Sequence, residues 1–384
     1  MSSTMSIDTM NKKVTQTLSP QSGFTLVEIM VAITVGLFLL GGVLQIFHSS
    51  KSTFRMSGDI SRMQENARFA MEFLTRDIRM AGFMPCARPG QVANTLNNGS
   101  SVQATNFFGA SPKGDEGGTS SFSGYPSVGT TAGDRVAGTD AITILKGGAN
   151  SFSIQSYNPN AAQFKINETN TFNSGDVVLI CDGTSASIFQ ITNTNQANKT
   201  IVHNTGVGTP GNCTKQLVPP VDCTNAGNST KTYGSDAQLV KLESVAYFIG
   251  VSTSGTTRSL YRITLNGGIA GAPQELVEGV ENMQILYGVD TDLSNDNTID
   301  RYVTANNVGI NNWNNVFSVR IGLLMQTLNN VSDQNDSKTY KVASTDIGTS
   351  GAVTHASDKR VRYVFNSTIK LRNRGQGIGL SAGL

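Results

Sequence analysis

An almost uninterrupted apolar run from Phe24 to Phe47 is the feature that most constrains the fold of this chain. The run is long enough to cross a membrane, since about 20 apolar residues in a helix span the hydrocarbon core of a bilayer. One acidic residue, Glu28, lies near its start. A charge inside a bilayer is costly, and such residues usually have a function. The alternative is an ordinary single-pass anchor in which Glu28 is incidental.

The residues before the apolar run indicate its orientation. Residues 1–22 are polar and contain Lys12 and Lys13, which predicts that this end stays in the cytoplasm. A secretory signal peptide would have its cleavage site after the apolar core, whereas Gly23 stands directly before the core. The sequence therefore favours a membrane anchor over a cleaved secretory signal.

The junction itself resembles that of the type IV prepilins, whose pattern is a short basic leader ending in Gly, followed by Phe-Thr-Leu-x-Glu and an apolar helix. Gly23, Phe24, Thr25, Leu26 and Glu28 match it. The resemblance implies that a membrane-embedded prepilin peptidase cuts between Gly23 and Phe24 and methylates the new amine. It also implies that Glu28 pairs with the Phe24 amine of an adjacent subunit during assembly. The alternative for Glu28 is a protonated or snorkelling side chain with no role in assembly.

The helix is predicted to continue beyond the membrane. No proline occurs between Phe24 and Met80, and Gly82 and Pro85 mark the end of the helix. Apolar residues recur at helical spacing and predict a face that packs on the rest of the protein: Ile60, Met63, Ala67, Ala70, Leu74 and Ile78. We therefore divide the chain into a leader (1–23), a transmembrane helix (24–50), its amphipathic continuation (51–84) and a periplasmic or extracellular domain (85–384).

The domain after residue 85 is rich in Ser, Thr, Asn and Gly, which is typical of an exported β-rich domain with many turns. The expected fold class is α+β, with the long N-terminal helix packed on a large antiparallel β-rich head. Segments with strand-like composition are Asp140–Leu145, Ser151–Tyr157, Val177–Cys181, Ser187–Thr192, Thr200–His203, Leu239–Ile249, Leu260–Leu265, Gln284–Tyr287, Val316–Gln326 and Arg362–Leu371.

The four cysteines, Cys86, Cys181, Cys213 and Cys223, all follow the membrane segment. An even number in an exported domain predicts disulfides. Cys213 and Cys223 bracket a short loop and are expected to pair, which leaves Cys86 to pair with Cys181. A zinc site is the alternative, although the cysteines lack the paired spacing of zinc ligands.

An acidic segment resembles a calcium-binding loop. Asp290, Asp292 and Ser294 stand at the first, third and fifth positions of an EF-hand-like start, and Asp296 and Asp300 follow. The segment departs from that motif because Asn295 replaces the turn glycine and Arg301 stands where a bidentate Glu belongs. The alternative is an acidic turn between two strands, stabilised by its own hydrogen bonds.

Other functional classes have little support in the sequence. The net charge of +2 lacks the basic excess expected of a dedicated nucleic-acid binder. The glycines of 206–211 match a dinucleotide-binding pattern, but Pro219 and Pro220 follow without a helix. No set of catalytic residues emerges, so the chain is not expected to be an enzyme or to need a cofactor, calcium excepted.

Two further blocks narrow the resemblance to the PilW family of minor pilins. These are residues 64–68 together with 76–83 and Cys86, and the closing segment Ser367–Asn373. The family implies a type IV pilus subunit that helps to initiate pilus assembly at the tip. It would lie in the bacterial inner membrane before assembly and at the cell surface afterwards, and could serve adhesion and twitching motility. Its implied partners are the prepilin peptidase, other minor pilins, the major pilin and a possible tip adhesin, with nucleic acid unlikely. The alternatives are a J-type pseudopilin of type II secretion and an adhesive module at the pilus tip.

Overall fold

The computed structural model describes residues 23–84, 92–97, 111–117, 125–218, 221–266, 269–292, 296, 298–309, 313–343 and 352–373. Its contacts divide the chain into two compact units, residues 1–55 and 56–384. The first contains the apolar part of helix α1 (Leu26–Arg79), and the second contains the rest of α1 and the head.

In the first unit, α1 is a continuous helix whose apolar side chains are exposed, including Ile33, Leu37 and Phe47. It continues through Gly41 and Gly42, although glycine costs about 1 kcal/mol relative to alanine inside a helix. Among the described residues it is the one helix long and apolar enough to cross a membrane. Exposed apolar side chains on every face of a helix are suited to lipid rather than water.

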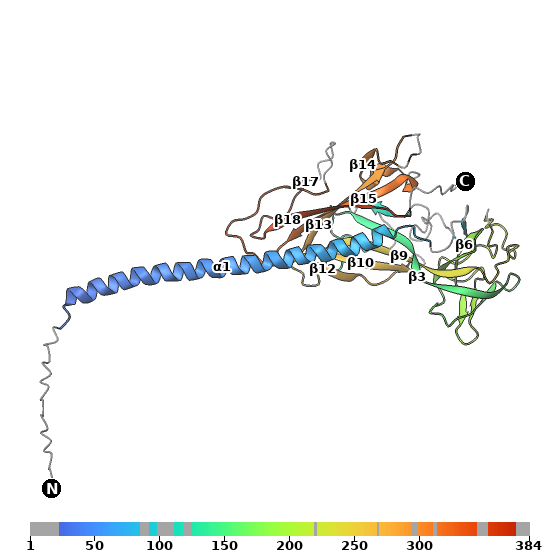
Figure 1. Ribbon diagram of the computed structural model, residues 1–384, viewed down its shortest axis with the longest axis horizontal. Coiled ribbons are helices and arrows are strands. Elements are labelled where there is room, and N and C mark those ends of the chain that lie inside the picture. Colours follow the sequence, from blue (N-terminus) through green and yellow to red (C-terminus); the bar gives the residue numbers. More distant parts are fainter. Residues whose placement is uncertain are drawn as a thin grey trace, which may run out of the picture. The chain divides into compact units, whose positions relative to one another are not determined.

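The part of α1 in the second unit packs on the head, as the apolar spacing predicted (Figure 1). Its buried apolar residues are Met63, Ala67, Ala70, Leu74 and Ile78. Gly82 follows the helix with a φ of 69°, a left-handed conformation that glycine adopts without steric cost. Its amide donates a hydrogen bond to the Leu145 carbonyl at 2.8 Å, which ties the end of the helix to the head.

The larger sheet of the head has twelve strands. Two long strands, β3 (Ala141–Asn158) and β9 (Gln238–Val251), form its centre and pair antiparallel. The strands beside them are β1 (Val92–Asn94), β6 (Ala186–Gln190) and β5 (Val177–Cys181) on one side and β4 (Gln163–Ile166), β8 (Thr200–Val202) and β7 (Asn193–Asn195) on the other. The remaining strands are β10 (Arg258–Asn266), which pairs with β9, β11 (Ile269–Ala270) and β12 (Gln274–Glu278), and β2 (Lys113–Asp115), which pairs with β3.

The second sheet has four strands in the order β14 (Arg301–Val303), β13 (Val280–Val289), β15 (Val316–Gln326) and β18 (Arg362–Lys370). The short helices α3 (Ala305–Val308) and η2 (Trp313–Asn315) connect β14 to β15. The two-stranded sheet of β16 (Tyr340–Lys341) and β17 (Ala352–Val353) packs through Val342 and Val353 against Leu324 of β15.

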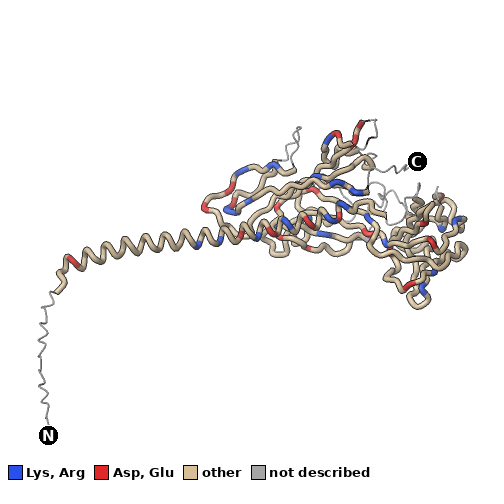
Figure 2. The backbone as a smooth tube through the Cα atoms, viewed as in Figure 1, with Lys and Arg blue, Asp and Glu red and all other residues tan. Residues whose placement is uncertain are grey.

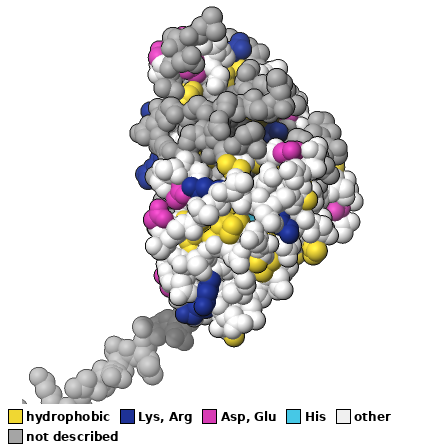
Figure 3. Space-filling model, turned by 90° about the vertical axis from the view of Figure 1, so that its right-hand side faces the viewer, with side chains coloured by type: hydrophobic (Ala, Val, Ile, Leu, Met, Phe, Trp, Pro, Cys, Tyr) yellow, Lys and Arg dark blue, Asp and Glu magenta, His cyan; other side chains and the backbone are white. Residues whose placement is uncertain are grey.

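The main hydrophobic core lies between α1 and the two large sheets. It joins α1 residues such as Leu74 to Tyr247 of β9, Ile285 of β13 and Ile321 of β15. A second, aromatic core lies under β3, β4, β5 and β6, with Phe164 and Phe189 at its centre. On the face of the head shown in Figure 3, charged side chains are scattered over a surface made mostly of uncharged polar side chains and backbone.

The α+β fold class is confirmed, and each segment predicted as a strand overlaps one. The sequence predicted two strands where the structure has one, since β3 continues across Gly147 and Gly148 with a shift of register between Gly147 and Ser151. The sheet also differs from a purely antiparallel one, because β1 and β6 pair in parallel. The other described strands were not predicted, because each is only two to five residues long: β1, β2, β4, β7, β11, β12, β14, β16 and β17.

Candidate functional site

Thr25 and Glu28 form a reciprocal hydrogen-bonded cap at the start of α1. The Thr25 amide donates to Glu28 Oε2 at 3.1 Å, and the Thr25 hydroxyl donates to the same oxygen at 3.1 Å. In return, the Glu28 amide donates to Thr25 Oγ1 at 3.2 Å. This is a capping box, in which two residues three positions apart satisfy amides that the first helical turn leaves without partners.

Glu28 is also isolated as a charge. Figure 2 shows an acidic residue at the start of α1 followed by a long stretch without Lys, Arg, Asp or Glu. The cap therefore gives the carboxylate hydrogen-bond donors from its own chain, in a stretch of α1 without Lys or Arg. Sequence reasoning singled out Glu28 but missed this cap, although Thr-x-x-Glu before an apolar run is the signal for it. Of the predicted processing site, Gly23 and Phe24 both precede the helix and are exposed.

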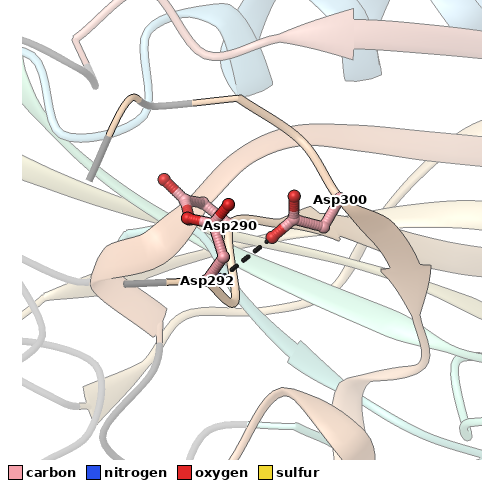
Figure 4. Close-up of side chains that lie close together, drawn as sticks. All are labelled: Asp290, Asp292 and Asp300. Atoms are coloured by element: carbon pink, nitrogen blue, oxygen red, sulfur yellow. Dashed lines mark hydrogen bonds between the residues drawn. The ribbon is translucent and has the colours of Figure 1, made fainter. Parts of the chain in front are cut away.

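The predicted calcium loop connects β13 to β14. The two strands pair antiparallel, with Val289 opposite Arg301, so that Asp290 and Asp300 lie at the two ends of the hairpin loop. Carboxylate oxygens of Asp290, Asp292 and Asp300 all lie within 4.8 Å of one another (Figure 4). Asp290 is buried, whereas Asp292 and Asp300 are exposed. Ser294 lies outside the described residues, and Asp296 is not part of the group.

Asp300 already has hydrogen-bond donors in this loop. Its Oδ2 accepts from the Thr291 amide (2.7 Å), the Thr291 hydroxyl (3.0 Å) and the Asp292 amide (3.1 Å). These bonds hold the pKa of Asp300 below its ordinary value, so the carboxylate stays ionised. Three carboxylates at this separation fit the oxygen ligands that calcium prefers, at 2.3–2.6 Å from the ion. The same geometry fits the acidic-turn alternative, in which Asp300 holds the loop closed.

The cysteines lie in two places. Cys213 and Cys223 form a disulfide with a Cα–Cα distance of 5.0 Å, as predicted. Cys181 is buried at the end of β5, and its predicted partner, Cys86, lies outside the described residues. His203, the histidine nearest to this region in the sequence, packs against Phe164 and Phe189 in the aromatic core, with its ring tilted to both. Burial lowers its pKa to about 3, so His203 is a neutral core residue.

The glycine-rich segment 206–211 forms a turn beside the end of β6. Gly206, Gly208 and Gly211 have positive φ angles, and the Gly211 amide donates to Gln190 Oε1 at 2.7 Å. No helix begins in the described residues from 205 to 218, so the segment lacks the helix N-terminus that a dinucleotide site requires.

Comparison with known families agrees with this arrangement. Residues 18–44 match the family described as the prokaryotic N-terminal methylation motif. Residues 246–373 match the family described as type IV pilus-assembly protein W, PilW. No curated protein and no solved structure matches the chain significantly.

The two matches support a type IV pilus-related minor pilin, and the N-terminal motif and apolar helix fit a membrane-anchored pilin. More particularly, the chain resembles the PilW family over about a third of its length, from the end of β9 to Asn373. The match includes the predicted closing block Ser367–Asn373, whereas the predicted blocks at 64–68 and 76–83, with Cys86, lie outside both matched ranges.

Proposed function

We propose that this protein is a minor pilin that helps to initiate type IV pilus assembly at the tip. The observation that carries the proposal is the position of Glu28, capped by Thr25 in the first turn of a membrane-length helix and five residues after Gly23. A carboxylate held there can exchange its intramolecular donors for the free amine of a neighbouring subunit. Such a pair would fix the axial register between two helices.

The remaining steps follow from this role. A prepilin peptidase removes residues 1–23 and leaves Phe24 as the first residue. Before assembly, the mature chain lies in the inner membrane as a single-pass protein. It then joins other minor pilins, the major pilin and a tip adhesin in a pilus at the cell surface. The head is a structural part without catalytic activity. The alternatives are a J-type pseudopilin of type II secretion and an adhesive module at the tip.

The decisive experiment has two readouts on the full chain in its own host. Mass spectrometry of the protein from sheared pili is expected to find an N-terminus at Phe24. Deleting the gene is expected to reduce the number of pili per cell while leaving type II secretion intact. An uncleaved leader contradicts the pilin function, and normal piliation with lost secretion favours the pseudopilin.

A further inference from the structure

An arginine-lined groove runs along α1 in the head unit. Its volume is about 510 Å³, and the side chains around it come from the last turns of α1, from Met80 directly after the helix, and from Arg372, two residues after β18. The lining residues are Arg68, Met71, Glu72, Thr75, Arg76, Arg79, Met80 and Arg372. Figure 2 shows that charged residues of both signs gather along the second half of α1, whereas the first half has an acidic residue at its start and then a long stretch without charge.

The positive charge in this groove is largely unneutralised. Among the described residues, Arg68, Arg79 and Arg372 form no salt bridge. Arg76 lies 3.8 Å from a carboxylate oxygen of Asp77. That carboxylate is buried and already accepts hydrogen bonds from Lys146 and Tyr247.

Glu72 is the one acidic residue in the lining. Sequence spacing suggests that it pairs with Arg76 one turn later, but no salt bridge between them forms in the structure. Four guanidinium groups therefore face one carboxylate, in a chain whose positive and negative charges are otherwise nearly balanced. Such a local excess attracts an acidic partner, because complementary charges steer and orient association.

The groove also has an apolar character that helps to identify the partner. Met71 and Met80 contribute flexible apolar side chains that adapt to a partner's shape. Arginine binds carboxylates with two parallel hydrogen bonds and is favoured at protein interfaces. A nucleic-acid backbone would gain nothing from the methionines, and Glu72 would repel its phosphates. A protein segment with both carboxylates and apolar side chains fits both parts of the lining.

We propose that this groove docks an acidic segment of a neighbouring pilus subunit. The proposal rests on the proposed function and adds a second contact to it, since Glu28 pairs within the membrane segment whereas the groove acts on the head. Arg76 and Arg79 receive the partner's carboxylates, and Met71 and Met80 contact its apolar side chains.

The test places a photoreactive benzoylphenylalanine at Thr75 of the full chain in piliated cells. Irradiation is expected to join the chain to a pilin, at a peptide that contains Asp or Glu next to apolar residues. Arg76→Glu with Arg79→Glu is expected to lower the cross-linked yield, and the amount of the chain in sheared pili, at least about tenfold. Arg76→Lys with Arg79→Lys keeps the charge and should retain most of the yield. Lys338→Glu with Lys341→Glu makes the same charge change on exposed residues elsewhere and should have no effect.

Three results would overturn the docking site: a cross-linked product that nuclease removes, no pilin adduct from Thr75, or a yield unaffected by charge reversal at Arg76 and Arg79. If one of these occurs while the chain in pili begins at Phe24, the groove hypothesis fails and the pilin function stands. If the chain keeps its leader or is absent from pili in the unmodified strain, the proposed function itself fails. Membrane levels of each variant show whether it folds.

Discussion

Tyr247 of β9 donates its hydroxyl to Asp77 Oδ2 at 2.6 Å, across 170 residues of sequence. Lys146 of β3 donates to Asp77 Oδ1 at 2.7 Å, so both oxygens of this buried carboxylate have a partner on the sheet. Asp77 lies in the last turn of α1, one residue from the core residue Ile78. The pair therefore fixes the end of the helix on the two central strands of the head.

Removing the hydroxyl tests this anchor. Tyr247→Phe keeps the ring in the core but leaves one oxygen of a buried carboxylate without its donor. We expect the free energy of unfolding to fall by about 1.5–3 kcal/mol, the usual range for hydrogen bonds to charged groups. Denaturant unfolding of the full chain in detergent measures the change. Tyr363→Phe, at an exposed tyrosine, should change it by less than about 0.5 kcal/mol. Equal effects in the two variants would contradict an anchoring role.

Asp77 and Asp140 should contribute to the pH dependence of folding stability with opposite signs. Hydrogen bonds from Lys146 and Tyr247 outweigh burial and lower the pKa of Asp77, so its contribution is complete above about pH 4 and is lost in more acidic solution. Burial, together with the charge of Glu116, raises the pKa of Asp140 to about 7. The folded protein then holds a proton that the unfolded chain has released, so stability falls as pH rises from about 4 to about 7.

The raised pKa of Asp140 therefore predicts that the head is more stable at pH 5 than at pH 8. The expected difference from this group is on the order of a few kcal/mol, since each pKa unit corresponds to about 1.4 kcal/mol. Asp140→Asn should flatten the profile between these values, whereas Asp236→Asn, at an exposed carboxylate, should leave it unchanged. Thermal unfolding of the wild type and both variants at pH 5 and pH 8 measures these differences. Parallel profiles for the wild type and Asp140→Asn would refute the assignment of this pH dependence to Asp140.

Glu28 could be singled out from the sequence, whereas the structural role of Asp77 could not. Glu28 stands out because its neighbours are all apolar, and β15 was predicted to the residue because Val316–Gln326 is a strongly apolar segment of strand length. Asp77 follows Arg76 and precedes Arg79, so it looks like one more charge on a solvated face. Its burial depends on Lys146 and Tyr247, which come from strands far along the chain.

The acidic hairpin loop provides a test of metal binding. We propose that Asp290, Asp292 and Asp300 bind calcium, in which case the full chain should melt at a higher temperature in millimolar calcium than in chelator. Asp292→Ala should remove this difference, because it deletes one of the three carboxylates. Asp333→Ala, at an exposed aspartate outside the loop, should keep it. Identical melting curves with calcium and with chelator would leave only the acidic-turn alternative.

The Cys213–Cys223 disulfide closes a short loop, with a sequence separation of 10. Chain entropy predicts that replacing both cysteines with serine lowers the free energy of unfolding by roughly 2–3 kcal/mol. Peptide mapping without reductant should recover this pair and, as the sequence predicts, Cys86 joined to Cys181. Recovery of Cys86 joined to Cys213 would contradict both assignments.

Glu28 caps its own helix through Thr25, and we propose that it also pairs with a neighbour's amine. Glu28→Ala removes both, whereas Glu28→Gln keeps a side chain able to cap the Thr25 amide but carries no charge. Membrane insertion should survive either change, because a helix without the charge is more apolar.

If the docking role is correct, both variants should reduce the number of pili per cell, since breaking one side of a buried ion pair typically costs roughly 3–5 kcal/mol. The assay counts surface pili and measures the membrane level of each variant. Normal piliation in Glu28→Gln would assign Glu28 to the helix cap alone. A shortage of pili in both variants at normal membrane levels requires the negative charge itself, because the amide side chain in Glu28→Gln can still accept the hydrogen bonds of Thr25 but cannot attract the amine of Phe24.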